Sequence, residues 1–206
     1  MLDLSSLNRR RTRRIRGRLH SLDELHTAAD TTQTVALQAR ILGLDPGSRI
    51  TGYAVLECDG ADIRYVASGG IRAEGRDFPA RLRQIYQGVA DLVLQHRPDE
   101  VAIERVFMHR NADSALKLGQ ARGAALSATF TVLPSVHEYA PREVKQAVVG
   151  TGAADKMQVQ LMVKRLLKLK GELGADASDA IAIALCHAHS RRLQGLLNAG
   201  STGARR

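Results

Sequence analysis

Three β-rich segments follow one another near the start of the patterned part of this chain, and this order restricts the folds open to it. Residues 40–44 form a short apolar strand that runs into the turn sequence DPG at 45–47. Residues 51–58 and 63–72 are also rich in β-forming residues, and the link between them opens with DG, a hairpin signal. Helical and strand patterns alternate after this point. We therefore expect an α/β domain with a mixed five-stranded sheet flanked by helices.

Apolar residues at three- and four-residue spacing predict the helices. The clearest helical face lies in 78–97, stopped by Pro98, and its members are Phe78, Leu82, Ile85, Val89 and Leu92. Two more strands are expected over 100–106 and 136–141. Further helices are expected over 112–128, 156–170 and 176–192. The last of these is rich in Ala and Ile, which predicts that it is largely buried.

The charge of the chain favours a polyanionic partner. It holds 30 Lys and Arg against 21 Asp and Glu, a net charge of +9. Residues 1–39 contribute seven Arg and four acids, so the rest keeps 23 basic against 17 acidic residues, or +6. A domain that stays basic without its basic leader is typical of a protein that binds nucleic acid.

The organisation expected from these patterns is one domain with tails. Residues 1–39 contain the block RRRTRRIRGR and no sustained periodicity, so we expect a basic, disordered extension. A translation start near Val35 is the alternative explanation of this leader. The domain is expected over 40–192, followed by a flexible tail over 193–206. No apolar run approaches the length of a membrane span, and only two cysteines occur, which together predict a cytoplasmic protein.

Four acidic residues stand at positions where a strand ends or a helix begins. Asp45 ends the first strand, and Glu104 follows the apolar run at 101–103. Asp176 and Asp179 lie three residues apart at the start of the last helix, so both point to one side. Strand ends on a common edge, with a helix start packed against them, would bring all four carboxylates together.

Each acid also has a structural explanation. Asp45 could be an ordinary turn residue, and Glu104 could pair with Arg105. Asp176 could cap the helix, and Asp179 could favour its dipole. Four such coincidences in one basic domain are less plausible than a shared site, because close carboxylates shift their pKa or recruit a divalent cation. Mg2+ prefers oxygen ligands, and two such ions about 4 Å apart can drive phosphodiester hydrolysis.

Four long blocks of the sequence resemble the RuvC family of Holliday junction endonucleases. They are ILGLDPGSRITGYAV at 41–55, AIERVFMHRNADSALKLGQARGAAL at 102–126, EYAPREVKQAVVGTGAADKMQVQLMV at 138–163 and ADASDAIAIALCHAH at 175–189. The resemblance implies an RNase H-like fold and a homodimeric, Mg2+-dependent nuclease. Such enzymes resolve four-way DNA junctions in recombination and repair by paired, symmetric nicks that leave 5′-phosphate and 3′-hydroxyl ends.

The resemblance also implies roles for individual residues. The acidic, metal-binding site of the family falls on Asp45, Glu104, Asp176 and Asp179. Its DNA-contacting lysines fall on Lys145 and Lys156, and its aromatic residue near the scissile strand falls on Phe107. The family uses two Mg2+ ions per subunit, for which Mn2+ can substitute, and works with a branch-migration complex of the RuvA and RuvB type. The 39-residue leader departs from the family, whose members start close to the first strand.

Three further motifs were weighed. The segment VVGTGAADK at 148–156 resembles a phosphate-binding loop but lacks the GK[ST] ending, so we interpret it as a turn that delivers Lys156. Cys186, His187 and His189 are too closely spaced for a usual zinc site, and the sequence assigns them no role. The small residues of 112–128 could face the sheet or form a twofold dimer seam; they are Ala112, Ala115, Gly119 and Gly123.

Three other functions were considered. An RNase H-like nuclease acting on RNA–DNA hybrids or plain duplex would share the acids. A non-catalytic junction-binding protein would be expected to have lost part of the acidic set, which is intact here. An actin-like ATPase, suggested by the turn after Asp45, would need a second phosphate-binding loop that the sequence lacks.

Overall fold

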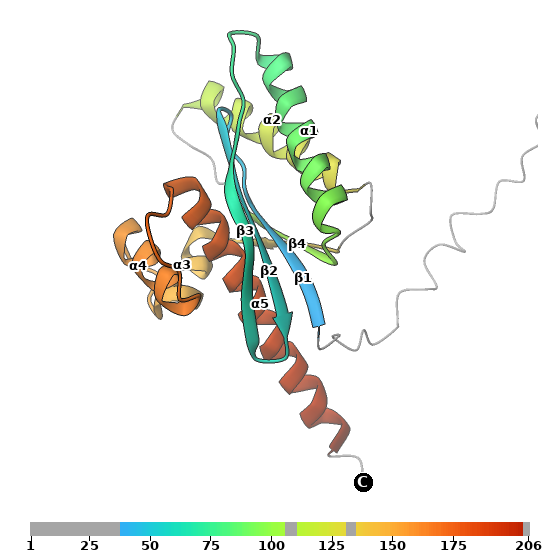
Figure 1. The fold of residues 1–206 in the computed structure, drawn as a ribbon, viewed down its shortest axis with the longest axis vertical. Coiled ribbons are helices and arrows are strands. Elements are labelled where there is room, and N and C mark those ends of the chain that lie inside the picture. Colours follow the sequence, from blue (N-terminus) through green and yellow to red (C-terminus); the bar gives the residue numbers. More distant parts are fainter. Residues whose placement is uncertain (1–37, 106–110, 131–134, 204–206) are drawn as a thin grey trace, which may run out of the picture. The chain divides into compact units, whose positions relative to one another are not determined.

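The computed structural model describes residues 38–105, 111–130 and 135–203 (Figure 1). Phe107 and nearly all of the 1–39 leader lie outside these residues. Within the described part, no helix is both long and apolar enough to cross a membrane.

The sheet is mixed and has five strands in the order β3-β2-β1-β4-β5. An antiparallel meander opens it, formed by β1 (Gln38–Asp45), β2 (Ile50–Asp59) and β3 (Asp62–Arg72). β4 (Glu100–Glu104) then pairs parallel with β1, and β5 (Ser135–Tyr139) pairs parallel with β4. The predicted mixed five-stranded α/β architecture is confirmed, with β1 starting two residues earlier than expected.

Helices cover both faces of the sheet (Figure 1). α1 (Phe78–His96) and α2 (Ala112–Thr129) lie together over one face. α3 (Pro141–Val149), α4 (Lys156–Leu166) and α5 (Ala175–Gly203) cover the other. Because side chains alternate along each strand, neighbouring residues serve different cores. Leu42 and Leu44 pack towards α1 and α2, whereas Ile41 packs towards α5.

The predicted apolar face of α1 is the one that packs on the sheet: Ile85, Val89 and Leu92 are buried. In α2 the predicted stripe of small residues does not face the sheet, which was the first of the two arrangements expected for it. Ala121, Ala125 and Ala128 face the core, whereas a Cβ added at Gly119 or Gly123 would meet no atom within 4 Å. The small-residue stripe therefore does not pack against the sheet.

α5 passes beyond residue 192, where we expected the domain to end, and stays helical to Gly203. Its buried part spans Ala177 to Ala188, as its Ala- and Ile-rich sequence predicts. Beyond it, Leu193, Leu196 and Leu197 are exposed, so this last stretch of helix adds little to the core. The flexibility expected of the 193–206 tail stays a prediction.

Candidate active site

The ends of two parallel strands place the first two acids side by side. β1 and β4 are parallel neighbours, and Leu44 is paired with Ile103. The next residue in each strand is an acid, Asp45 in β1 and Glu104 in β4. Both carboxylates therefore emerge at the same edge of the sheet.

Two glycines allow α5 to bring the other two acids to this edge. Gly52 of β2 is paired with Asp45, and a Cβ at Gly52 would lie 2.2 Å from the backbone oxygen of Asp176. A Cβ at Gly43 would lie 2.4 Å from the backbone oxygen of Ala180. The α5 backbone thus rests directly on the strands at positions where only glycine leaves room. The helix begins at Ala175, so Asp176 lies in its first turn rather than at the N-cap position, which was the structural explanation of this acid.

Burial, together with the charges of the neighbouring acids, allows Asp45 to hold a proton near neutral pH. Burial raises the pKa of Asp45 to about 7, and the charges of Glu104, Asp179 and Asp176 raise it further against the opposing effect of Lys156. Burial and Asp179 also raise the pKa of Glu104, while Lys145 and Lys156 lower it. Asp45 is at the centre of this repulsion, as expected for a group surrounded by three other acids.

Two lysines provide positive charge beside the acids. The Nζ atom of Lys156 lies 2.7 Å from Oδ2 of Asp179, and this contact raises the pKa of Lys156. Both lysines line a pocket of about 230 Å³ together with Asp45, Glu104 and Asp179. The sequence-predicted residues Lys145 and Lys156 therefore lie at the predicted acids, although no contact with DNA is present to test their role.

The turn before α4 explains the position of Lys156. α3 ends at Gly150, which adopts a φ of +88°. Asp155 then caps α4, because its side chain accepts a hydrogen bond of 2.8 Å from the backbone N–H of Gln158. The cap makes Lys156 the first residue of the helix, where its side chain reaches the acids. The segment VVGTGAADK is thus a connection between two helices, in agreement with the rejection of a phosphate-binding loop.

A half-buried arginine holds the strand ends that present Glu104. Arg122 of α2 donates from Nε to the Glu104 backbone oxygen at 3.3 Å, and its Nη2 lies 2.7 Å from Oε1 of Glu138. Arg105 donates to the Glu138 backbone oxygen at 3.4 Å. The pairing of Arg105 with the Glu104 carboxylate, which the sequence left open, is not among these contacts. Arg122 was not predicted, since nothing in the sequence links it to Glu104.

The donor set suits a hard divalent cation. Four carboxylates supply only oxygen ligands, which Mg2+ prefers. Their mutual repulsion, expressed in the raised pKa of Asp45, would be relieved by a bound cation. Lys156 already places an ammonium group against Asp179, a sign that the site favours positive charge. The residues present thus fit the metal that the sequence predicts.

A second polar group lies against the middle of α5. Ligand atoms of Glu100, His137 and His187 lie within 4.8 Å of one another, so this group also could hold a metal ion. Its contacts favour a hydrogen-bonded network instead. Oε2 of Glu100 lies 2.5 Å from His187 Nε2 and 2.6 Å from Arg191 Nε, so the carboxylate already has a hydrogen-bonding partner and a guanidinium partner. The His187 ring also stacks on His137 with a centroid distance of 4.1 Å.

The network gives His187 the role that the sequence could not assign. Its Nδ1 lies 2.6 Å from the hydroxyl of Tyr139, so a line of hydrogen bonds joins β5, α5 and β4. Burial raises the pKa of Cys186 to about 12, which keeps it a thiol. Nδ1 of His189 lies 3.2 Å from the backbone oxygen of Ala147. All three residues thus serve the packing of α5 on the domain.

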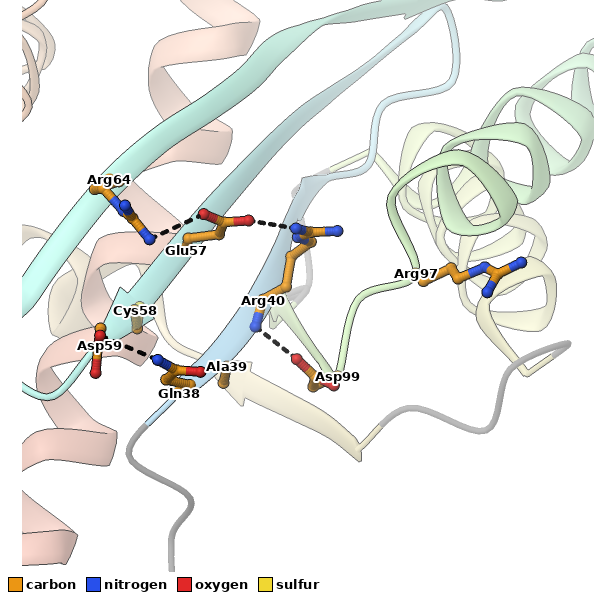
Figure 2. Close-up of a pocket in the computed structure, with 9 residues that line it drawn as sticks. All are labelled: Gln38, Ala39, Arg40, Glu57, Cys58, Asp59, Arg64, Arg97 and Asp99. Carbon is orange, nitrogen blue, oxygen red and sulfur yellow. Dashed lines mark hydrogen bonds and ion pairs between the residues drawn. The ribbon is translucent and has the colours of Figure 1, made fainter.

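A wider pocket, of about 500 Å³, lies at the start of β1, at the opposite end of that strand from Asp45 (Figure 2). Several of its charged groups pair with one another. Arg40 pairs with Glu57, and its backbone N–H donates to Asp99 at 2.7 Å. Arg64 adds a second cation, 3.4 Å from Glu57. These contacts tie β1, β2 and the entry to β4 together, and we interpret the pocket as structural.

The chain is similar to known proteins over most of its length. Residues 41–187 match the family described as "Crossover junction endodeoxyribonuclease RuvC". The chain is 54% identical over 166 residues to the crossover junction endodeoxyribonuclease RuvC of Vibrio cholerae, covering 81% of this chain and 96% of that protein. It is 55% identical over 166 residues to the protein of the same name from Photobacterium profundum, with the same coverage.

Solved structures show the same similarity. The structure of Thermus thermophilus RuvC in complex with a Holliday junction substrate has 34% identity and a TM-score of 0.71, over 76% of this chain and 97% of that one. A yeast mitochondrial Holliday junction resolvase has a TM-score of 0.56 over 78% of this chain and 81% of that chain. At 14% identity, the yeast protein supports the RNase H-like fold alone.

Proposed function

The chain belongs to the RuvC family of crossover junction endodeoxyribonucleases, and from this premise we propose that it resolves four-way DNA junctions by paired, symmetric nicks. One observation carries the proposal beyond family membership. Four acids that are far apart in sequence converge at one edge of the sheet beside two lysines, as a phosphodiester nuclease requires. The basic surface counters the repulsion between these acids and a DNA backbone.

We assign Asp45, Glu104, Asp176 and Asp179 as the ligands of two Mg2+ ions per subunit, with Mn2+ able to substitute. Bound Mg2+ supplies Lewis acidity that favours attack of water on the phosphodiester, leaving 5′-phosphate and 3′-hydroxyl ends. The protein itself holds the carboxylates in place through the ends of β1 and β4 and through α5, whose backbone packs on Gly43 and Gly52.

The proposed DNA contacts lie on the rim of the same site. Lys145 and Lys156 line the acidic pocket, and we propose that both bind backbone phosphates on one side of the cut. When a bound cation neutralises the Asp179 carboxylate, the ammonium group of Lys156 becomes available to bind the DNA. Phe107 is proposed to stack on an unpaired base at the opened junction, although it lies outside the described residues.

Two subunits are needed for paired nicks, so we propose a homodimer whose twofold axis matches the near-symmetry of the junction. The open small-residue stripe of α2 leaves a face that a second helix could approach closely. A branch-migration complex of the RuvA and RuvB type is the proposed further partner, and the cytoplasm is the proposed location.

A nicking assay on a synthetic mobile four-way junction with Mg2+ tests the proposal. Paired symmetric nicks are expected in the junction, with no cutting of a linear duplex or an RNA–DNA hybrid of the same sequence. Asp179→Asn should abolish cleavage and keep junction binding. Asp91→Asn is the matched control, because Asp91 is an exposed acid on α1.

The other outcomes separate the alternative functions. Equal cutting of duplex or hybrid would retain the chemistry and reject the junction as the substrate. Binding of the junction without any cutting by the wild-type protein would favour the non-catalytic junction-binding protein. Loss of both binding and folding in Asp179→Asn would show that the acid is structural.

A further inference from the structure

A second hollow adjoins the acidic site along the edge strand β3. It has a volume of about 340 Å³, and β3, the start of β2 and the segment leading into α5 form its walls. Asp176 lines this groove, whereas Asp45, Glu104 and Asp179 line the lysine pocket. Asp176 nevertheless lies beside Asp45, because its backbone oxygen packs on Gly52, the strand partner of Asp45. The four acids therefore separate two hollows, one containing Lys145 and Lys156 and the other bounded by β3.

An irregularity in β3 brings a tyrosine into this groove. Val55 is paired with Ala67 and Leu56 with Tyr65, so the register skips Val66. Without this bulge, Tyr65 and Ser68 would point to opposite faces of the strand, because side chains alternate. With it, Tyr65 lies on the same face as Ser68, which is the face covered by α5. β-Bulges of this kind commonly redirect a side chain next to an active site.

The groove offers a surface suited to a nucleobase. The Tyr65 hydroxyl lies 3.1 Å from Oγ of Ser68, which anchors the ring, and 40% of the residue stays exposed. Gly70 places no side chain on the wall, so a ligand can approach the backbone. Arg72 adds one cation, and Glu172 and Asp176 add two anions. This charge balance does not make a strong phosphate site, and the open aromatic ring is the main feature for recognition.

Resting on the proposed nuclease function, we propose that this groove holds the nucleotide next to the scissile phosphate, with its base stacked on Tyr65. A strand with its phosphate at the acids must leave the site in two directions. The lysine pocket receives it on one side, and the β3 groove receives it on the other. Arg72 then contacts the backbone of the nucleotide in the groove. Aromatic rings recognise bases of any sequence in this way.

Tyr65→Ala is the direct test, with Tyr65→Phe to keep the ring and Tyr86→Ala as the matched control. Tyr86 lies on α1 and is also 40% exposed. Junctions carrying 2-aminopurine on either side of the scissile phosphate are bound without divalent metal. We expect Tyr65→Ala to weaken junction binding about 5-fold or more and to remove the fluorescence change on one side only. Tyr65→Phe and Tyr86→Ala should retain both.

Arg72→Ala tests the groove independently of the tyrosine, should Tyr65→Ala fold poorly. Its junction affinity should fall less steeply with salt, by about one phosphate contact. Arg83→Ala, an exposed arginine on α1, should leave the salt dependence unchanged.

The outcomes distinguish this inference from the proposed function. If the wild-type protein does not nick the junction, the proposed function fails first. If it nicks normally and Tyr65→Ala equals the wild type in affinity, single-turnover rate and fluorescence, the groove assignment is overturned. Equal losses in Tyr65→Phe and Tyr65→Ala would also overturn it, because the hydroxyl contact with Ser68 would then matter rather than the ring.

Discussion

At the scale of single residues, the main feature of the site is that the fold holds four mutually repelling carboxylates close together. Asp45 lies at a strand end that glycine packing keeps close to α5, and it cannot move away from the other three carboxylates. Such an arrangement costs stability without a cation and is relieved when one binds. Perturbed carboxylates of this kind are a feature of functional sites rather than of ordinary turns.

Asp45→Asn should stabilise the metal-free protein at pH 8. The pKa of Asp45 is raised from 3.8 to about 7, so in this range the folded protein holds a proton that the unfolded chain has released. The free energy of unfolding therefore falls as pH rises from about 4 to 7, and the Asn variant lacks this loss. After allowance for the partial exposure of Asp45, the expected gain at pH 8 is about 2 kcal/mol.

Urea denaturation in EDTA at pH 5 and pH 8 measures this difference. Adding Mg2+ at pH 8 should stabilise the wild type and have a smaller effect on Asp45→Asn. A variant less stable than the wild type at pH 8 without metal would contradict the prediction.

Lys156→Ala should weaken junction binding and reduce its salt dependence. The ammonium group lies at the acids, where the DNA backbone is proposed to pass. Loss of one phosphate contact lowers the slope of log affinity against log salt by roughly 0.7 to 0.9. Lys117→Ala is the control, because Lys117 pairs with Asp113 on the surface of α2. An unchanged slope in Lys156→Ala would count against the assigned contact.

At the scale of elements, the site forms only because α5 is held in one position on β1 and β2. The helix carries two of the four acids, and it rests on β1 and β2 through Gly43 and Gly52. Near the middle of the helix, Glu100 binds His187 and Arg191, which fixes the helix against β4. Both contacts hold one long helix in a single position over the sheet.

Gly52→Ala should damage the site more than the fold. The new Cβ would lie 2.2 Å from the Asp176 backbone oxygen, so the start of α5 must shift. Overpacking of this kind costs roughly 1 to 3 kcal/mol, and the shift should abolish the stabilisation by Mg2+. Gly195→Ala is the matched control, since nothing lies within 4 Å of its added Cβ. Urea denaturation with and without Mg2+ measures both effects, and a normal Mg2+ response in Gly52→Ala would contradict this account.

At the scale of the whole molecule, the family match begins close to the residue at which the described sheet begins. The family match spans 41–187, and the described sheet begins at Gln38. The Vibrio cholerae relative is covered to 96% of its length by 81% of this chain, so the leader has little counterpart in it. The 1–39 leader thus stays a predicted basic extension of a domain that carries its own core.

Removal of residues 1–34 should leave folding and junction cleavage intact. The described core starts after these residues, and all four acids lie within it. Thermal unfolding should occur at the same temperature as in the full chain, and nicking rates at moderate salt should match. Loss of cleavage by the shortened protein would show that the leader takes part in the reaction.

The sequence by itself predicted most of the elements and the residues proposed to carry the chemistry, but it missed α3 (Pro141–Val149). Hydrophobic periodicity is a local property, so it predicts the meander, the alternating helices and the strand that ends in Glu104. The four acids could be named because their positions break these patterns and match a known family, whereas the roles of Lys145 and Lys156 came from the resemblance. The expectation for Phe107 came from the resemblance alone.

Only the tertiary structure decided distances between residues that are remote in the chain. It placed Asp176 on Gly52, divided the acids between two hollows and turned Gly119 and Gly123 away from the sheet. It also joined His187 to Glu100 across 87 positions of sequence. These facts depend on how helices pack on a sheet, and the bulge at Val66 shows that one unpaired residue can redirect a side chain. Packing sums many weak contacts from distant segments, so local patterns cannot specify it.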